Sequence, residues 1–453
     1  MRFVVIIVFF LLYVPVGLIY GQHPVSQLGA DTVSIRLIPD SVHLDSEVEQ
    51  PQQWPRKRHS PAADSIYDDA IMLPESLEND VDSLLTDWFV QTYAHRDSSC
   101  VSQVDNIVYP DSVYRRRLEM LPAYIEMPYN SVVRQFIDLY TGRRRELVEY
   151  MLGLGVYYFP IFEQELEKNG LPLELKYLPI IESALNPKAT SRAGAAGLWQ
   201  FMLPTAKLMG LEVNSLVDER RDPYKSSAAA ARYLKELYDI YQDWNLVIAA
   251  YNCGPGTVNK AIRRAGGKRD YWEIYYYLPR ETRSYVPLFI AANYVMTYYN
   301  EHNICPVQTD FTTSIDTVEL NRPYHMVQIS EVLKVPIEQI RDLNPHYRRD
   351  IIPGDSIKSR SLCLPSQYIY AFIEEQDSIV AYKADSLQRR SIAGPLLAKG
   401  KAGIGTAIYY KIKNGDTLST IARKHRVSIK DLKEWNNLRN SKIRAGKTLI
   451  IYN

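Results

Sequence analysis

The sequence predicts a mainly α-helical protein whose C-terminal part carries small α+β modules. Three observations lead to this fold class. Apolar residues recur at helical spacing through much of residues 81–305, and strand-like alternation is scarce there. After residue 305, short β-branched runs flank pairs of short helices. Residues 326–354 also align with residues 418–446 without a gap, which indicates that one module occurs twice.

The composition of the 453-residue chain is that of a soluble globular protein, with 46% hydrophobic and 23% charged residues. Its 53 basic and 52 acidic residues give a formal net charge of +1, which excludes a global basic field, so we expect no nucleic-acid partner. The charge is uneven, because residues 408–453 hold 11 basic and only 3 acidic residues. Four cysteines without CxxC spacing are too few for a disulfide scaffold.

The N-terminus is predicted to be a signal peptide over residues 1–21. A basic start precedes an apolar run from Phe3 to Val14, which is shorter than the roughly 20 residues of a membrane span. We therefore expect export and no stable membrane span after cleavage, whereas an uncleaved segment would remain as a membrane anchor. Residues 22–80 hold six prolines and 11 acidic against 4 basic residues, which predicts a disordered acidic linker.

Helix limits follow from local signals. Apolar spacing predicts a helix over 140–169 that stops at Asn169-Gly170. Asp222 followed by Pro223 is a helix start, and that helix is expected to reach about Tyr241. A further helix is expected from about Glu281 to Asn300.

Each copy of the repeated module is predicted to be strand, helix, helix, strand. In the second copy, residues 408–412 form the first strand and Asn414-Gly415-Asp416 the turn after it. Ser428 with Asp431 is a capping-box start for its second helix.

Common catalytic patterns are missing from the sequence. The eight histidines form no HxxH or HExxH pair, and there is no GxSxG elbow or phosphate-binding glycine loop, so we expect neither metal nor cofactor. Cys253 is a candidate nucleophile because Gly254-Pro255-Gly256 starts a helix whose N-terminus would lower a thiol pKa. A small buried side chain in a tight turn is the favoured interpretation of this cysteine.

Three blocks carry more informative chemistry. Glu182 ends a mostly apolar segment, where desolvation would raise its pKa as a general acid requires. Small residues over 194–197 allow a backbone to approach a ligand closely. Tyr251 and Asn252, at the end of a predicted helix, suit hydrogen bonds to sugar hydroxyls and an acetamide.

These blocks, Glu182-Ser183, Gly197-Leu198-Trp199-Gln200 and Ala250-Tyr251-Asn252, resemble in order and spacing the soluble-lytic-transglycosylase family, relatives of goose-type lysozyme. The segments 171–179 and 281–286, with the C-terminal repeats, resemble its subgroup of membrane-bound lytic murein transglycosylase D. Residues 408–453 are similar to a lysin-motif (LysM) domain. The chain departs from that subgroup in lacking a lipid-attachment cysteine and in having Pro323-Tyr324 where the second copy has Gly-Asp.

The resemblance implies a lysozyme-like helical catalytic domain that acts on peptidoglycan glycan strands in the periplasm, associated with the cell wall. The implied reaction breaks the β-1,4 bond between N-acetylmuramic acid and N-acetylglucosamine and leaves 1,6-anhydromuramyl ends, with Glu182 as the catalytic acid and base. A hydrolytic muramidase and an inactive peptidoglycan-binding protein are the alternatives. Substrate-binding residues implied are Ser183, Gly197, Leu198, Trp199, Gln200, Tyr251, Asn252 and Tyr285, and for LysM glycan binding Asn414, Gly415, Asp416 and Thr417.

The expected domain organisation has seven parts. They are a signal peptide (1–21), an acidic linker (22–80), a helical N-terminal subdomain (81–170), a lysozyme-like domain (171–305), a degenerate LysM-like module (310–365), a linker (377–407) and a LysM domain (408–453). We expect the first copy of the repeat to pack on the catalytic domain as a spacer, and the second to bind glycan.

Overall fold

The computed structural model describes residues 59–68, 72–73, 94–95, 100, 106–309, 314–384, 386–387 and 407–452, except 426, 437, 439 and 442. The expected signal peptide, most of the acidic linker, residues 81–93 and residues 388–406 of the second linker lie outside this part. Within it, no helix is both long enough and apolar enough to span a bilayer.

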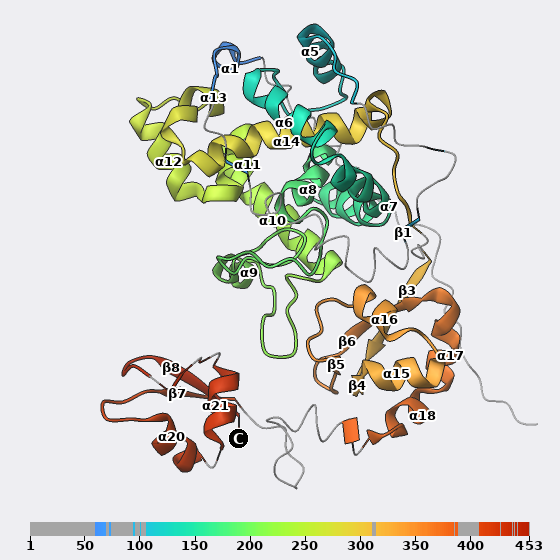
Figure 1. The fold of residues 1–453 in the computed structure, drawn as a ribbon. Coiled ribbons are helices and arrows are strands. Elements are labelled where there is room, and N and C mark those ends of the chain that lie inside the picture. Colours follow the sequence, from blue (N-terminus) through green and yellow to red (C-terminus); the bar gives the residue numbers. More distant parts are fainter. Residues whose placement is uncertain are drawn as a thin grey trace, which may run out of the picture. The chain divides into compact units, whose positions relative to one another are not determined.

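Residues 106–309, called the helical domain below, are helical as predicted (Figure 1). The long helix α14 (Arg280–Tyr298) is buried on nearly all sides between Ser284 and Met296 and packs on α6, α8 and α11. A helix that is apolar all round forms the core of a helical domain. The helices are α5 (Asp111–Glu119), α6 (Ser131–Thr141), α7 (Arg145–Lys168), η1 (Leu173–Tyr177), α8 (Leu178–Ser183), α9 (Leu203–Leu208), α10 (Pro223–Tyr241), α11 (Trp244–Cys253), α12 (Pro255–Arg264), α13 (Tyr271–Ile274), η2 (Tyr275–Tyr277), α14 and η3 (Tyr299–His302).

The predicted helix limits are confirmed for α10 and α14, and α7 ends next to Asn169 as expected. The Asp222 carboxylate accepts hydrogen bonds from the backbone N–H groups of Tyr224 and Lys225, both at 3.0 Å, which caps α10. The predicted start of α7 at residue 140 is wrong. Gly142 ends α6, and a Cβ there would lie 2.8 Å from the Asp138 carbonyl oxygen, so the chain turns before α7 begins.

The N-terminal segment that the structure describes is partly folded. Residues of the predicted acidic linker form the short helix α1 (Pro61–Asp64), and Ala63 and Ile66 are buried in the core of the helical domain. The Asn130 side-chain amide also donates to the Ala63 carbonyl at 3.2 Å. The prediction of disorder is therefore wrong here, because these apolar side chains have a core to join.

A disulfide links Cys100 to Cys305 across 205 positions of the sequence. Near it, the two-residue strands β1 (Ala94–His95) and β2 (Gln308–Thr309) pair antiparallel. The sequence alone does not predict this pairing, because Cys100 and Cys305 lie too far apart in the chain for any local pattern to connect them.

The repeated strand, helix, helix, strand module is confirmed in both copies. In the first, β3 (Ile315–Leu320) pairs antiparallel with β6 (Arg360–Pro365), and in the second β7 (Ala407–Lys411) pairs with β8 (Thr448–Tyr452). Between them lie β4 (Pro323–His325), α15 (Met326–Leu333), α16 (Ile337–Leu343) and β5 (Ile351–Pro353) in the first copy, and α20 (Leu418–His425) and α21 (Ile429–Trp435) in the second.

An asparagine at the equivalent position stabilises each copy of the module. The Asn344 amide donates to the carbonyls of Ile340 and Cys363 and accepts from the Cys363 N–H, all within 2.9 Å. Asn436 makes the corresponding three bonds to Leu432 and Ile450. One amide thus joins the second helix to the last strand in each copy, and that of Asn344 is fully buried.

The first copy extends beyond its predicted end. After β6 come η4 (Ser366–Tyr368), α17 (Ile369–Glu374) and α18 (Gln376–Ala381), and the buried side chains of Phe372 and Ile379 belong to its core. The expectation of a linker from residue 377 is therefore wrong over α18. Residues 314–381 are called the first repeat below.

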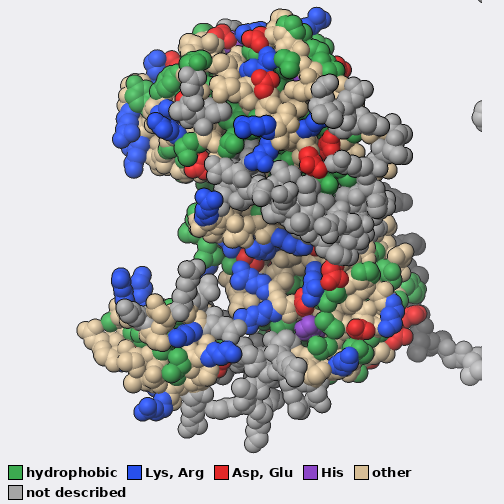
Figure 2. Space-filling view, in the orientation of Figure 1, with side chains coloured by type: hydrophobic (Ala, Val, Ile, Leu, Met, Phe, Trp, Pro, Cys, Tyr) green, Lys and Arg blue, Asp and Glu red, His purple; other side chains and the backbone are tan. Residues whose placement is uncertain are grey.

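The second repeat, residues 407–452, has the predicted turn and cap. Gly415 has a φ of +90° in the turn before α20. The Asp431 N–H donates to the Ser428 hydroxyl at 3.0 Å and the Ser428 N–H donates to the Asp431 carboxylate at 3.2 Å. Lys and Arg side chains are spread over the visible face of this module (Figure 2).

The first repeat packs on the helical domain through residues 212–218. Val217 is buried in the core of the repeat and forms a β-bridge with Tyr347. Ion pairs surround this contact, including Lys188 with Asp342 at 2.5 Å and Arg360 with Glu212 at 2.9 Å. An apolar contact enclosed by ion pairs is typical of a specific interface between domains.

Candidate active site

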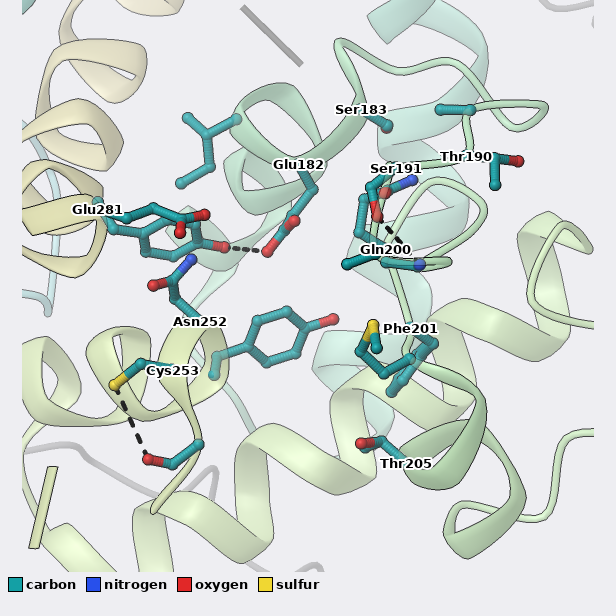
Figure 3. A pocket seen from close by; sticks show the side chains of 18 of the residues that line it. Glu182, Ser183, Thr190, Ser191, Gln200, Phe201, Thr205, Asn252, Cys253 and Glu281 are labelled. Atoms are coloured by element: carbon teal, nitrogen blue, oxygen red, sulfur yellow. Dashed lines mark hydrogen bonds between the residues drawn. The ribbon is translucent and has the colours of Figure 1, made fainter. Parts of the chain in front are cut away.

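A cavity of about 600 Å³ opens in the helical domain and brings the three sequence blocks together. Its wall comes from α8, the loop 186–202, α9, α10, the end of α11 and the start of α14 (Figure 3). Among the residues predicted for the site, six line this cavity: Glu182, Ser183, Gln200, Tyr251, Asn252 and Tyr285.

Glu182 lies near the end of the six-residue helix α8, whose neighbouring apolar residues Ile180 and Ile181 are buried. Ala184 ends the helix in the left-handed conformation, with a φ of +48°. The Glu182 side chain points into the cavity (Figure 3) and its Oε1 accepts a hydrogen bond from the Tyr285 hydroxyl of α14.

Burial raises the pKa of Glu182 to about 8. The hydrogen bond from Tyr285 opposes this rise, because it stabilises the carboxylate, and the charge of Glu281 adds to it. Around neutral pH the carboxyl is therefore largely protonated, which is the state that a proton donor needs.

Tyr251 and Asn252 come from the last turn of α11. The Tyr251 hydroxyl donates to the Trp199 carbonyl at 2.8 Å, and Asn252 Oδ1 accepts from the Thr282 hydroxyl at 2.8 Å. These bonds fix the end of α11 against the second block and against α14. Figure 3 shows the Asn252 amide nitrogen turned toward Glu182, where it can donate to a ligand.

Ser183 joins the first block to the second. Its hydroxyl lies within hydrogen-bonding distance of the Leu198 carbonyl at 2.9 Å and of the Pro179 carbonyl at 3.1 Å. On the opposite side of the cavity, the Gln200 amide donates to the Gly197 carbonyl at 2.8 Å, which holds its side chain across its own turn.

Three residues of the second block lie away from the cavity, contrary to expectation. The side chains of Leu198 and Trp199 are buried in the core, and the Trp199 indole N–H donates to the Ser227 hydroxyl at 2.9 Å. Gly197 is needed for packing rather than for ligand approach, since a Cβ there would lie 1.8 Å from the Arg220 carbonyl oxygen. These residues shape the loop that carries Gln200.

Several lining residues were not predicted as site residues. Glu281 stands in the first turn of α14, within a segment singled out only for its resemblance to the family. Tyr233 of α10 follows the apolar spacing of its helix, so no local signal separates it from a core residue. The others include Phe201, Met202 and Thr205, next to the second block.

Cys253 does not have the environment of a nucleophile. Burial raises the pKa of its thiol, opposite to the lowering expected from a helix N-terminus, and the sulfur contacts its neighbour's carbonyl, that of Gly254, at 3.8 Å. The favoured interpretation, a small buried side chain in a tight turn, is met in part, because Cys253 stands in the turn but is only half-buried and lines the cavity.

In the second repeat, the four predicted glycan-binding residues form the turn before α20. Asp416 accepts hydrogen bonds from the Lys413 N–H at 2.8 Å and the Tyr410 hydroxyl at 2.9 Å. The Thr417 hydroxyl accepts from the Thr420 N–H at 3.1 Å and so caps the helix, while Asn414 and Gly415 form the tip of the turn.

Comparison with known families gives three matches along the chain. Residues 159–274 match the Transglycosylase SLT domain, residues 314–381 match the Lytic transglycosylase MltD, LysM-like domain, and residues 410–451 match the LysM domain.

Two relatives that are similar in sequence agree with these matches. The chain is 31% identical over 331 residues to membrane-bound lytic murein transglycosylase D of Escherichia coli K12, which covers 72% of this chain and 70% of that one. It is 31% identical over 153 residues to the soluble lytic murein transglycosylase of the same strain, covering 31% and 24%. A crystal structure of the 70 kDa soluble lytic transglycosylase from Escherichia coli aligns over 32% of this chain and 25% of that one, with 27% identity and a TM-score of 0.28.

The substitution Gly197→Ala should destabilise the protein strongly. Gly197 has a φ of +85° and no room for a Cβ, so we expect a loss of roughly 3 kcal/mol or more in the free energy of unfolding. Gly194→Ala is the matched control, because Gly194 has a φ of +90° and nothing within 4 Å of its Cβ position. Thermal unfolding followed by circular dichroism measures both. Equal losses would mean that backbone conformation alone, and not the contact with Arg220, requires Gly197.

Proposed function

This chain belongs to the membrane-bound lytic murein transglycosylase D family, and on that premise we propose that it cleaves the β-1,4 bond between N-acetylmuramic acid and N-acetylglucosamine of peptidoglycan, leaving 1,6-anhydromuramyl ends. The observation that carries the proposal is Glu182, a carboxyl with a raised pKa that points into the cavity from a largely buried helix. Its proton is available to the glycosidic oxygen around neutral pH.

The proposed reaction uses one carboxyl twice. The protonated Glu182 gives its proton to the leaving glycosidic oxygen as the bond to C1 of the muramic residue breaks. The resulting carboxylate then takes the proton from the C6 hydroxyl of the same sugar, whose oxygen forms the new bond to C1. Glu182 ends protonated as it began, and no water is consumed. Because the nucleophile is part of the substrate, no second molecule has to be captured.

The surrounding residues are proposed to orient the acid and the sugar. Tyr285 donates to Glu182 Oε1, which fixes the carboxyl and leaves its other oxygen for the substrate. The Asn252 amide is suited to an acetamide or a hydroxyl of the glycan, and Gln200 faces the cavity from the opposite wall (Figure 3). Tyr251 and Ser183 position the walls through the bonds described above.

Hydrolysis by a muramidase is the second candidate, and one observation favours it. Glu281 lines the same cavity, and most glycosidases use a second carboxylate to activate water or to form a covalent intermediate. Glu281 lies in the first turn of α14, the helix that also carries Tyr285. The mass of the products separates the two reactions, since a reducing end is heavier than an anhydro end by one water.

The two repeats are proposed to have different tasks. The second, with 11 basic against 3 acidic residues over 408–453, is suited to hold glycan strands whose stem peptides carry carboxylates. In the first, Pro323 pairs with Pro353, and Arg322 and Tyr324 beside it contact Asp377 and Gln376. These contacts occupy the positions that correspond to Asn414-Gly415-Asp416, which supports a structural role. The implied location is the periplasm, at the cell wall.

Glu182→Gln should abolish turnover while the fold persists. We expect the rate to fall by roughly a hundred- to ten-thousand-fold, because the amide can neither donate nor accept the required proton. The measurement is release of muropeptides from purified sacculi, with mass spectrometry of the products. Glu281→Gln is the matched control. It should retain activity and anhydro products if Glu182 works alone, and its inactivity would favour the muramidase.

Activity should fall as the pH rises through about 8, because Glu182 must start protonated and loses its proton above its pKa. Tyr285→Phe removes a hydrogen bond that lowers this pKa, so the falling limb should move to higher pH in that variant. The rate of release of soluble fragments at each pH measures both profiles. A wild-type rate that still climbs well above pH 9 would contradict Glu182 as the proton donor.

Removal of residues 408–453 should release most of the protein from sacculi in a co-sedimentation assay. The remaining attraction is weak because the deleted module carries the excess of basic residues. The first repeat alone should stay in the supernatant. Strong sedimentation of that fragment would show that the first repeat binds glycan and would overturn the division of tasks.

A further inference from the structure

We propose that the first repeat positions one wall of the active site, and that Arg348 does so through Asp218 and Arg220. This inference rests on the proposed function, because the wall in question is the one that faces Glu182 across the substrate cavity. Arg348 and Asp218 are positioning residues in this scheme, since neither lines the cavity.

The wall is the loop from Gly194 to Phe201, and Ala195, Gln200 and Phe201 line the cavity. A single nitrogen, Arg220 Nη1, donates to the Gly194 carbonyl at 2.9 Å and to the Phe201 carbonyl at 3.1 Å. One guanidinium therefore ties the two ends of the loop together. The Arg220 backbone also fills the space beside Gly197, so its position determines how the loop packs.

Arg220 is held in turn by Asp218. The Arg220 Nε and Nη2 atoms donate to the two oxygens of the Asp218 carboxylate, both at 2.9 Å, in a bidentate pair that fixes the guanidinium plane. The Asp218 side chain is fully buried. Burial would raise the pKa of Asp218, but hydrogen bonds from Arg220 and Arg348 outweigh it and keep the pKa below its ordinary value.

The third member of the relay comes from the first repeat. Arg348 Nη2 donates to Asp218 Oδ2 at 2.6 Å. The backbone at this point is also paired across the interface, because the Asp218 N–H donates to the His346 carbonyl at 2.8 Å and the Arg348 N–H donates to the Leu216 carbonyl at 2.7 Å. Docking of the repeat thus fixes Asp218, Asp218 fixes Arg220, and Arg220 fixes the loop.

The consequence for the reaction is specific. The loop that carries Gln200 lies across the cavity from the Glu182–Tyr285 pair, which belongs to α8 and α14 (Figure 3). A displaced loop therefore weakens sugar binding, while Glu182 keeps its hydrogen bond from Tyr285, to which the loop does not contribute. Loss of Arg348 should raise KM with little effect on kcat and no effect on the pH profile. A general loss of fold would instead lower kcat and the melting temperature together.

The test compares Arg348→Met with Arg341→Met in the full chain. The two arginines are matched, because both belong to the first repeat, both side chains are about two-fifths exposed, and each donates to a carboxylate at 2.6 Å. The partners of Arg341 are Asp350 and Glu338 of the same repeat, so loss of the Arg341 side chain does not affect a contact with the helical domain. Kinetics use soluble peptidoglycan glycan fragments, and melting temperatures are recorded for every variant.

For Arg348→Met we expect KM to rise roughly threefold to tenfold, with kcat within about twofold of the wild type and an unchanged pH profile. Arg341→Met should have wild-type kinetics. Arg348→Lys should raise KM less than Arg348→Met does, because an ammonium supplies the charge but not the planar geometry. In an Arg220→Lys background, Arg348→Met should have a smaller effect than in the wild type, as expected for two residues in one relay.

Equal KM values for the Arg348→Met and Arg341→Met variants would overturn the proposal. An equal fall of kcat in these two variants would overturn it as well. If Arg348→Met does not fold, Arg348→Lys against Arg341→Lys makes the same comparison. The outcome is separate from that of the proposed function. Products of the wild type identify the reaction, and the KM comparison holds whether those products are anhydro or reducing ends.

Discussion

The hydrogen bond from Tyr285 to Glu182 is the contact on which the candidate active site depends. It joins a helix of only six residues to the central helix of the domain. So short a helix has little stability of its own and keeps its place through packing. The helix α14 supplies that packing on α8, so it fixes the position of the acid. Burial is the main cause of the raised pKa of Glu182, and Tyr285 and Glu281 of α14 adjust that pKa in opposite directions.

Around this pair, hydrogen bonds from side chains to backbone carbonyls hold the loop that forms one wall of the cavity. The backbone carbonyls of this loop accept hydrogen bonds from side chains of α8, of α11 and of the loop itself. The pairs are Ser183 with Leu198, Tyr251 with Trp199 and Gln200 with Gly197. The loop is held by these polar partners in addition to the buried side chains of Leu198 and Trp199. Arg220 provides two further hydrogen bonds, and its own place is set at the interface with the first repeat. The loop that faces Glu182 and the interface with the first repeat therefore belong to one hydrogen-bond network.

The sequence predicted those features that have local causes. The cap at Asp222, the turn at Gly415 and the acid Glu182 in its apolar segment were all available from a few neighbouring residues. Leu198 and Trp199 show the limit of that reasoning. A motif indicates that residues belong to a site, but it does not show which side chains face the cavity. Here both side chains are buried in the hydrophobic core. The burial of α1 and the docking of Val217 were equally inaccessible, because each depends on a surface formed far away in the chain.

The disulfide between Cys100 and Cys305 closes a covalent ring around almost the whole helical domain. All the blocks that line the cavity lie inside this ring, as do the surface loops between them. A protease that cuts one such loop therefore produces two pieces that stay joined as long as the bond is oxidised. The native packing then has only to hold neighbouring elements in register, since neither piece can diffuse away. Where proteases are present, a nicked molecule of this kind remains a single particle.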